Sequence, residues 1–290
     1  KKRIIIALFA LVLQFICNAQ SSNNFDKIWV TGEPMPYTIN FNNSGITTSR
    51  TDTTKRIFLQ IGNTNICDSF GNLVMVSNGY TLFDKNLNII EGGDTLVPPE
   101  LFNKYGFSLA SQSSIILPFA NGKYYFVTPT ASDSVVINGW NTWPQNATFD
   151  MLLYAVVDMK ANNGAGKVVR KKVPILHFDS LQLSKTQMMA CKHGNGKDWW
   201  LLKQGWNGNI VYKFLFRQDT VLGPEVQTFA APAFNSFEQS GQSVFSRDGT
   251  KYATTCRGAL QLFVADFDRC TGMLSNPKVY PVPMNQPYWP

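Results

Sequence analysis

The sequence predicts an all-β protein made of repeated four-stranded antiparallel sheets, and three observations lead to that prediction. Aromatic residues make up 13% of the chain and charged residues only 16%, a composition that favours strands and turns. No long stretch with helical periodicity follows the first 20 residues. A short turn containing glycine recurs about every 50 to 75 residues, each time between two apolar runs typical of strands. These turns are 68–72, 120–123, 193–198 and 247–251.

The four repeats share one plan, in which strand A, a tight turn and strand B are followed by strands C and D. The end of strand C also matches between repeats, because 153–158 resembles 262–266. Sheets of this size cannot bury their own faces and must stack, and four-stranded antiparallel modules arranged around an axis are β-propeller blades. We therefore predict an incomplete β-propeller ring of about four blades plus an N-terminal piece. In the order A to D, the expected strands of the first repeat are 62–67, 72–77, 81–84 and 87–90, and those of the second are 113–117, 123–128, 151–158 and 167–173. The expected strands of the third repeat are 186–191, 199–203, 209–217 and 225–229, and those of the fourth are 241–246, 251–256, 260–267 and 278–282.

The first residues form a separate segment with the features of a secretory signal peptide. A basic start at 1–3 precedes the almost wholly apolar run 4–16, and Cys17, Asn18 and Ala19 then offer small residues for cleavage. The apolar run is shorter than the roughly 18–20 residues that span a bilayer. We expect cleavage after Ala19, a secreted or cell-surface protein, and no membrane span after cleavage.

The remaining chain divides into two parts. Residues 20–56 are expected to be N-terminal strands and a loop, with one or two strands at 25–42 and the polar loop at 43–56. Residues 57–290 are expected to be the propeller blades.

The charge of the chain does not predict nucleic-acid binding. Without the leader, 23 basic residues stand against 19 acidic ones, which leaves a net charge of about +4 spread along the chain. The densest basic cluster, Arg170-Lys171-Lys172, falls inside a strand-like run and is interpreted as a solvated strand face.

Cysteine and histidine spacing predicts neither a metal site nor a cofactor. Outside the leader the cysteines are Cys67, Cys191, Cys256 and Cys270, and they match no zinc pattern. An exported protein can form disulfides, and four cysteines allow three pairings. Free thiols within strands fit the sequence equally well, so the pairing stays open.

Three runs of sequence resemble a known family. They are 66–73, 195–200 and 267–277, and together they resemble secreted β-propeller proteins of Bacteroidetes, which often carry a C-terminal sorting domain of the type IX secretion system or a gliding-motility-type domain. The resemblance covers roughly 25–283 and implies a ring of about seven blades. It therefore implies a fragment truncated within the propeller, without the sorting domain, in which the strands at 25–42 would complete the last blade.

A catalytic interpretation of the sequence has few candidates. His193 is near the carboxylate of Asp198, but its turn has a sufficient structural explanation. His177, in an apolar loop, is expected to be a packed residue. Acidic residues from several blades could converge as in a polysaccharide hydrolase or lyase. Turn capping explains Asp68 and Asp248 as well, and the matching strand ends of Asp158 and Asp266 suggest a repeated structural role. These acidic residues are Asp68, Asp158, Asp248 and Asp266.

Strand parity predicts an interaction face. A–B and C–D turns leave a four-stranded meander from one end, and B–C and D–A loops leave from the other. The A–B turns are tight, whereas the other end receives loops 91–112, 129–150, 174–185, 205–208 and 230–240. The aromatic residues on these loops are Tyr105, Phe107, Trp140, Trp143, Trp206, Phe234 and Phe237.

These aromatic residues either anchor a protein or glycan partner at the cell surface or simply pack the loops onto the blades. The hypothesis that follows is an exported, non-enzymatic binding or adhesion module. The polysaccharide hydrolase or lyase remains the alternative.

Overall fold

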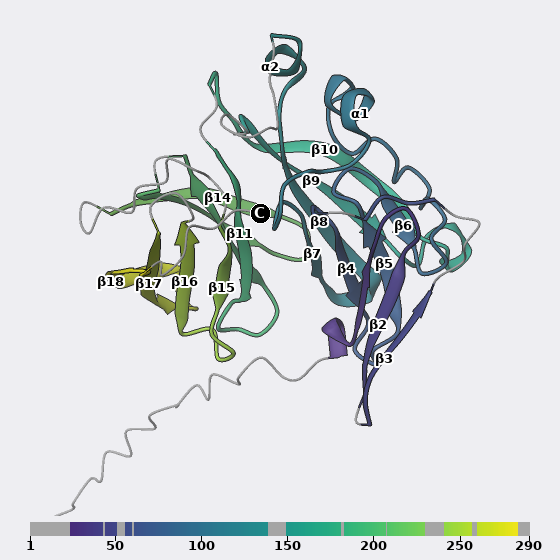
Figure 1. The fold of residues 1–290 in the computed structure, drawn as a ribbon, viewed down its shortest axis with the longest axis horizontal. Helices are drawn as coiled ribbons and strands as arrows, with labels where there is room; N and C mark the ends of the chain where they lie inside the picture. Colours follow the sequence, from purple (N-terminus) through teal and green to yellow (C-terminus); the bar gives the residue numbers. More distant parts are fainter. Residues whose placement is uncertain are drawn as a thin grey trace, which may run out of the picture.

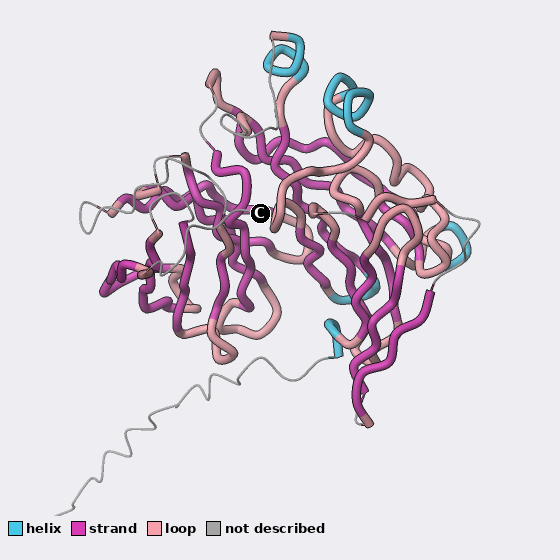
Figure 2. The backbone as a smooth tube through the Cα atoms, viewed as in Figure 1, coloured by secondary structure: helices cyan, strands magenta, loops and turns pink. Residues whose placement is uncertain are grey.

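The residues that the structure describes form antiparallel sheets, as predicted, and two short α-helices (Figures 1 and 2). The computed structural model describes residues 24–42, 44–50, 56–59, 61–138, 149–180, 183–206, 208–229, 241–256 and 260–283. The expected signal peptide lies outside these residues. In the described part of the chain, no helix is long and apolar enough to cross a membrane.

In the described ranges, five sheets follow one another along the sequence, each a simple meander of antiparallel strands. The N-terminal sheet contains β1 (Ile28–Thr31), β2 (Tyr37–Asn42) and β3 (Gly45–Arg50). Blade 1 contains β4 (Thr64–Cys67), β5 (Leu73–Ser77) and β6 (Leu82–Asp84). Blade 2 contains β7 (Ile115–Pro118), β8 (Lys123–Thr130), β9 (Met151–Asp158) and β10 (Lys167–His177). Blade 3 contains β11 (Leu183–Lys192), β12 (Trp199–Gly205), β13 (Ile210–Phe216) and β14 (Val221–Thr228). Blade 4 contains β15 (Ser243–Phe245), β16 (Lys251–Cys256), β17 (Gln261–Asp268) and β18 (Met273–Pro281).

The sheets are arranged as blades of an open propeller. The first strands of blades 1 to 4, which are β4, β7, β11 and β15, lie next to one another on the inner side. The N-terminal sheet lies beside β4 at one end of the series, and blade 4 forms the other end. The ring formed by the described residues is not closed (Figure 1).

Blade 1 has three strands, so the expected fourth strand at 87–90 is wrong. Asp84 holds the turn after β6 by accepting bonds from the backbone N–H groups of Asn86 and Asn88, both at 2.8 Å. Ile89 then forms a single bridge with Phe83. The chain next turns toward blade 2, where the N–H of Val168 donates to the carbonyl of Glu91 at 2.8 Å.

Two expected loops also contain strand residues. The segment 43–56 contains β3, because the β-branched residues Ile46, Thr47 and Thr48 pair with β2 despite their polar surroundings. The segment 174–185 is short as a loop, since β10 continues to His177 and β11 begins at Leu183.

The core consists of apolar layers between neighbouring sheets. Tyr125 and Phe216 meet between blades 2 and 3 with ring centroids 5.2 Å apart. Between blades 3 and 4, Phe229 and Phe263 meet at 5.2 Å. Inner blades therefore bury both faces, which explains why their strands are continuous apolar runs rather than alternating ones.

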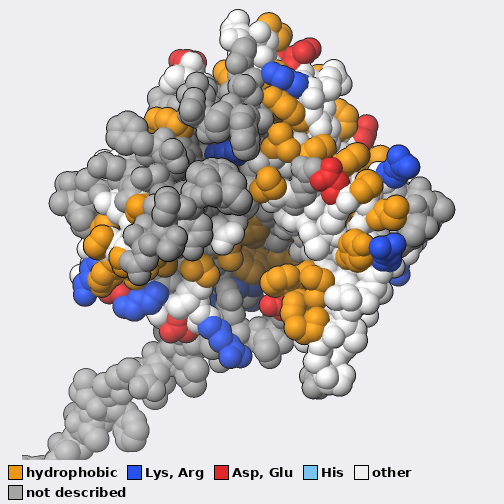
Figure 3. All heavy atoms as spheres, in the orientation of Figure 1, with side chains coloured by type: hydrophobic (Ala, Val, Ile, Leu, Met, Phe, Trp, Pro, Cys, Tyr) orange, Lys and Arg blue, Asp and Glu red, His pale blue; other side chains and the backbone are white. Residues whose placement is uncertain are grey.

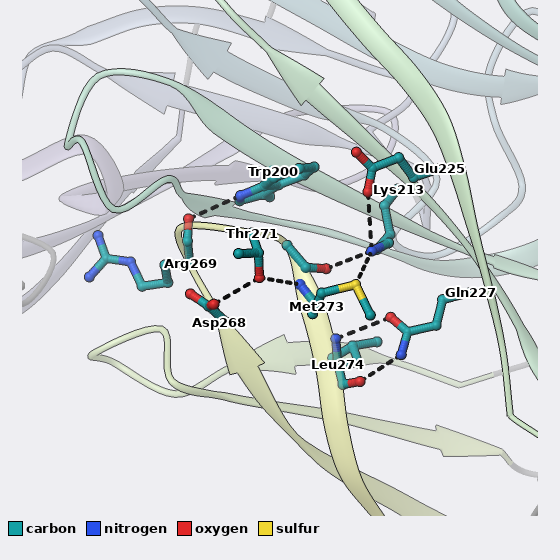
Figure 4. A network of polar contacts seen from close by, with 10 residues as sticks. Trp200, Lys213, Glu225, Gln227, Asp268, Arg269, Thr271, Met273 and Leu274 are labelled. Carbon is teal, nitrogen blue, oxygen red and sulfur yellow. Dashed lines mark hydrogen bonds and ion pairs between the residues drawn. The ribbon is translucent and has the colours of Figure 1, made fainter.

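Polar contacts fasten blade 4 to blade 3 (Figure 4). Trp200 donates its indole N–H to the carbonyl of Arg269 at 3.0 Å, and Lys213 donates to the carbonyl of Gly272 at 2.9 Å. Both acceptors lie in the turn between β17 and β18. The turn between β17 and β18 is thus an attachment point between blades.

Candidate interaction face

The two helices lie at the same end of the sheets (Figure 1). Helix α1 (Pro99–Tyr105) belongs to the loop before blade 2, and α2 (Asp133–Ile137) to the loop between β8 and β9. The backbone N–H of Glu100 donates to Oδ1 of Asp133 at 3.0 Å, so the loops are bonded to each other. We call this end of the blades, where the B–C and D–A loops leave, the loop face.

The local sequence fixes the ends of α1. Pro99 begins the helix, where its missing N–H costs nothing. Gly106 ends it with a φ of 70°, and its N–H donates to the carbonyl of Phe102 at 2.7 Å. The end of α1 therefore places Tyr105 and Phe107 on the loop face.

An exposed apolar cluster forms around Phe107. Its ring stacks on Phe58 with centroids 5.4 Å apart and planes 12° apart. The side chain of Phe58 remains 40% exposed, and Ile61, three positions further along the chain, is 58% exposed. Other hydrophobic side chains are visible at the surface over α1 and the loops beneath it (Figure 3).

Tyr105 is half-buried, and the ammonium group of Lys104 lies 5.4 Å from its ring centroid. Trp206, also half-buried, follows β12 in the loop between β12 and β13. Of the seven predicted aromatic residues, the structure thus describes Tyr105, Phe107 and Trp206. The other four lie outside the described residues: Trp140, Trp143, Phe234 and Phe237.

Sequence reasoning missed Phe58 and Ile61. Both lie in the segment between β3 and β4, which is not among the loops that strand parity assigns to this face. Two bulky apolar residues just before a strand are, on sequence alone, only weak evidence for an interaction site. Only the stacking on Phe107, 49 positions further along the chain, gives Phe58 a place on this face.

The opposite end of the blades carries tight turns closed by their own aspartates. Asp68 accepts bonds from the N–H groups of Phe70 at 2.8 Å and Asn72 at 2.9 Å. Asp248 accepts bonds from the Ser246 hydroxyl at 2.6 Å and the N–H of Thr250 at 3.1 Å. These bonds, led by that of Ser246, lower the pKa of Asp248 to about 2.

The other two candidate carboxylates also have structural partners. Asp158 accepts a bond from the N–H of Lys160 at 2.9 Å. Asp266 binds the ammonium group of Lys251 and accepts a bond from the amide of Asn276 at 2.8 Å. Each of these carboxylates holds a local turn or strand pair, which is the interpretation expected from turn capping.

His193 contacts backbone groups through both ring nitrogens. Its Nδ1 accepts a bond from the N–H of Asn195 at 3.0 Å, so Nε2 carries the proton and donates to the carbonyl of Cys270 at 3.0 Å. Asp198 accepts a bond from the side-chain amide of Asn195 at 2.9 Å. A histidine that acts as a catalytic base is normally oriented by a carboxylate bonded to one of its ring nitrogens, whereas both ring nitrogens of His193 are bonded to backbone groups.

The prediction that His177 is packed is wrong. It ends β10 next to buried Leu176, and strand alternation turns its side chain outward, where it is 57% exposed. Its Nε2 lies 3.9 Å from Oδ2 of Asp150.

The basic cluster in β10 has partners that fit a strand face. Arg170 donates to the hydroxyl of Tyr154 at 3.2 Å, and Lys171 pairs with Asp94 at 3.4 Å.

Among the cysteines with described side chains, Cys67 is a buried free thiol and Cys270 an exposed one. Cys191 is also buried, and its Sγ donates to the carbonyl of Lys192 at 3.6 Å. Burial raises the pKa of the Cys67 thiol. Over the described ranges, no group of three or more His, Cys, Asp or Glu side chains could hold a metal ion.

Comparisons with known proteins give similarities of fold. No protein-family model matches the chain, and no curated protein matches it. A protein of unknown function from Desulfotomaculum acetoxidans is 12% identical with a TM-score of 0.46, over 86% of this chain and 65% of its own. A proposed 6-phosphogluconolactonase from Bacteroides fragilis has the same identity and TM-score, over 90% of this chain and 69% of its own. The β-propeller domain of Cps50 from Myceliophteria thermophila is 12% identical with a TM-score of 0.34, over 87% of this chain and 82% of its own. These similarities are too low to carry an argument about function.

Proposed function

We propose that the chain is an exported, non-enzymatic binding module whose protein partner docks on the loop face. The observation that carries the proposal is the stacked pair of Phe58 and Phe107, in which the side chain of Phe58 stays 40% exposed. Large apolar side chains left at a surface mark interaction sites when they gather in one place. Rigid sheets hold the loops that present them.

The chemistry of the cluster favours a protein over a glycan. Phenyl rings and an isoleucine side chain offer no hydrogen-bonding groups, whereas sugar hydroxyls need such groups once they are desolvated. Apolar side chains of a protein can cover the same surface without that cost. The neighbouring Tyr105 adds a ring with a polar end, a residue type enriched in protein interfaces.

Export rests on the basic, apolar and small-residue segments of 1–19. The partner would then be met outside the cell or on its surface. The hydrolase or lyase alternative gains nothing from the acidic residues described, since Asp68, Asp158, Asp248 and Asp266 serve turns and strand pairs.

The experiment is cell-surface binding by variants on opposite ends of the blades. The double variant Phe58→Ala/Phe107→Ala removes the stacked pair from the loop face. The matched control is Phe70→Ala, because Phe70 is 79% exposed in the turn between β4 and β5 at the opposite end. Binding of fluorescent protein to intact cells of the producing organism is titrated by flow cytometry, with melting temperature measured in parallel.

We expect the double variant to bind more than tenfold more weakly, since truncating a central aromatic residue costs about 2 kcal/mol or more. The control should bind like the wild type. Protease treatment of the cells should abolish binding, whereas binding lost only after glycosidase treatment would indicate a glycan partner. Equal losses in the double variant and the control would refute the loop face as the docking site.

A further inference from the structure

Asparagine followed by glycine occurs six times in the chain, and this pair is the sequence most prone to lose a side-chain amide spontaneously. The backbone nitrogen of the glycine can attack the side-chain carbonyl carbon of the asparagine, because glycine has no Cβ that obstructs the approach. The structure describes both residues of four such pairs. Their asparagines are Asn78, Asn121, Asn163 and Asn195.

Two of these side-chain amides are held in place by hydrogen bonds. Asn78 is buried, and its amide bonds to backbone groups through both its oxygen and its nitrogen. Asn195 is exposed, but its Oδ1 accepts bonds from the N–H groups of Lys197 at 2.9 Å and Asp198 at 3.0 Å. Its Nδ2 also donates to Oδ2 of Asp198 at 2.9 Å. Neither carbonyl carbon can turn toward the next backbone nitrogen without breaking such bonds.

The amide of Asn163 is not held in this way. Asn163 lies in the turn between β9 and β10, where its side chain is exposed and its backbone is left-handed, with a φ of 54°. Its side chain makes no hydrogen bond to any other residue that the structure describes. No side chain of Asn162–Gly164 is buried, so this turn can open without disturbing the core.

The pairs at Asn163 and Asn195 are otherwise well matched. Both asparagines and both glycines are exposed. The glycine N–H donates to the carbonyl three residues earlier, at 3.1 Å for Gly164 and 2.9 Å for Gly196. A Cβ on either glycine would meet no atom within 4 Å. The pairs therefore differ in the hold on the asparagine side chain and in the left-handed backbone of Asn163.

The pair at Asn121 has less freedom than the pair at Asn163. The side chain of Asn121 is exposed, but Gly122 is half-buried, and a Cβ there would lie 3.4 Å from Cγ of Lys160. The carbonyl of Gly122 also accepts a bond from the N–H of Met159 at 2.9 Å. The attacking nitrogen at this position therefore has less room than that of Gly164.

We propose that Asn163 is a site of spontaneous deamidation. The backbone nitrogen of Gly164 forms a bond to Cγ of Asn163, its proton passes through solvent to Nδ2, and the bond from Cγ to Nδ2 breaks as ammonia leaves. Water then adds to one of the two carbonyl carbons of the resulting succinimide ring and opens it. Opening at Cγ gives aspartate, whereas opening at the backbone carbonyl gives isoaspartate, in which the chain continues through the former side chain.

Either product carries a new carboxylate where the amide was neutral. The turn between β9 and β10 is a C–D turn, so this charge appears at the end of blade 2 opposite to the loop face. The modification therefore goes beyond the proposed binding function and leaves its residues unchanged.

The test follows the purified full chain during incubation in a mildly alkaline buffer. Trypsin releases Asn163 in peptide 161–167 and Asn195 in peptide 193–197, because a lysine precedes and ends each of them. Liquid chromatography with mass spectrometry separates the amide, aspartate and isoaspartate forms, and fragmentation distinguishes Asn163 from Asn162. The same chain incubated in urea is the unfolded reference.

We expect Asn163 in the folded chain to convert at least about tenfold faster than Asn195, a difference of about 1.4 kcal/mol in activation free energy. In urea the two should convert at similar rates, because the bonds that hold Asn195 are gone. Asp198→Ala removes the carboxylate bonded to Nδ2 of Asn195, so conversion of Asn195 should become faster. Asn163 should keep its wild-type rate in that variant.

Three results would overturn the proposal. Asn195 could convert as fast as Asn163 in the folded chain. Asn163 could stay intact in the folded chain and convert only in urea, which would show that the turn prevents ring closure. The preference for Asn163 could persist unchanged in urea, which would show that the neighbouring sequence and not the fold sets the rates.

Discussion

Gln227 of blade 3 binds both backbone groups of Leu274 in blade 4. Its Nε2 donates to the Leu274 carbonyl at 2.6 Å, and the Leu274 N–H donates to its Oε1 at 3.1 Å (Figure 4). Gln112, which precedes blade 2, makes the same pair of bonds with Ser243 in β15. Side-chain amides thus supply, between blades, the paired donor and acceptor that a neighbouring strand supplies within a sheet.

The first prediction concerns this amide. Gln227→Ala should lower the free energy of unfolding by about 1–3 kcal/mol, because it leaves a backbone donor and acceptor of Leu274 without their partners. Gln218→Ala is the control, since Gln218 makes one longer bond, 3.3 Å, at an exposed position. Urea unfolding checks both variants, and a loss in Gln227→Ala no larger than that of the control would contradict the prediction.

The second prediction compares two glycines in equivalent turns. Gly272, between β17 and β18, has a φ of 70°, and a Cβ there would lie 2.7 Å from the Trp200 ring. Gly164, between β9 and β10, has a φ of 86° and no atom within 4 Å of such a Cβ. Both alanine variants suffer the backbone strain of a positive φ.

Only Gly272→Ala also forces the blade 3–blade 4 contact apart. We therefore expect it to lose about 1–3 kcal/mol more than Gly164→Ala in urea unfolding, the range found for overpacked cores. Trp200 fluorescence should shift in Gly272→Ala alone. Equal stability losses in the two variants would show that the ring moves aside without cost.

The strands of blades 2 to 4 were predictable because buried sheets give long apolar runs bounded by glycine turns. The expected strand 251–256 coincides with β16. The failures arise where tertiary contacts override local pattern. Residues 87–90 carry an apolar pattern, yet Glu91 bonds to Val168 of blade 2, and the segment forms no fourth strand. Ile46 and its neighbours look like a polar loop until β2 gives them a partner.

The sequence predicted which loops meet at one end of the blades, but not all of the residues that come together there. Strand parity sends the loops 91–112 and 129–150 to the same end of the blades, and α1 and α2, which form within these loops, lie together there (Figure 1). The contribution of Phe58 could not be predicted, because its stacking on Phe107 depends on how blade 1 meets the loop before blade 2. Sequence spacing carries no information about such a contact.

The third prediction concerns export. When the chain is produced with its leader in a secreting bacterial host, the exported protein should begin at Gln20, after cleavage behind Ala19. Lys2→Glu together with Arg3→Glu should reduce export, because the basic start of a leader is lost. Mass spectrometry of the exported fraction checks the new terminus. A mature protein that keeps residues 1–19, or one lipidated at Cys17, would contradict the prediction.

The last prediction concerns Lys203, a fully buried lysine in β12. Its ammonium group donates to the carbonyl of Thr186, and its neighbours across the strands are Met188 and Tyr212. Burial lowers the pKa of Lys203 from 10.5 to about 7. Burial also raises the pKa of Tyr212 above its ordinary value of 10.0. Tyr212 therefore ionises above most of the pH range, from about 7 to 10.5, in which the protonation of Lys203 differs between the folded and unfolded chain.

The sign of the effect follows from proton binding. Between about pH 7 and pH 10.5 the unfolded chain, with an ordinary lysine, binds more protons than the folded chain. Stability contributed by this site therefore rises with pH across that window, by at most about 1.4 kcal/mol per pH unit. Below pH 7 the lysine is protonated in both states and its burial costs the most.

Lys203→Met should reduce this dependence and make the protein more stable at pH 7; the slope that remains is expected from Lys192, whose pKa burial lowers to about 8. Methionine fits a long, narrow site without a charge, and the Thr186 carbonyl keeps the Ser184 hydroxyl at 3.2 Å. The free energy of unfolding in urea, measured at several values between pH 7 and pH 10, checks the slope. Lys85→Met, at an exposed position, should keep the slope of the wild type. If Lys203→Met keeps that slope as well, another group titrates in the window and Lys203 does not set the pH dependence.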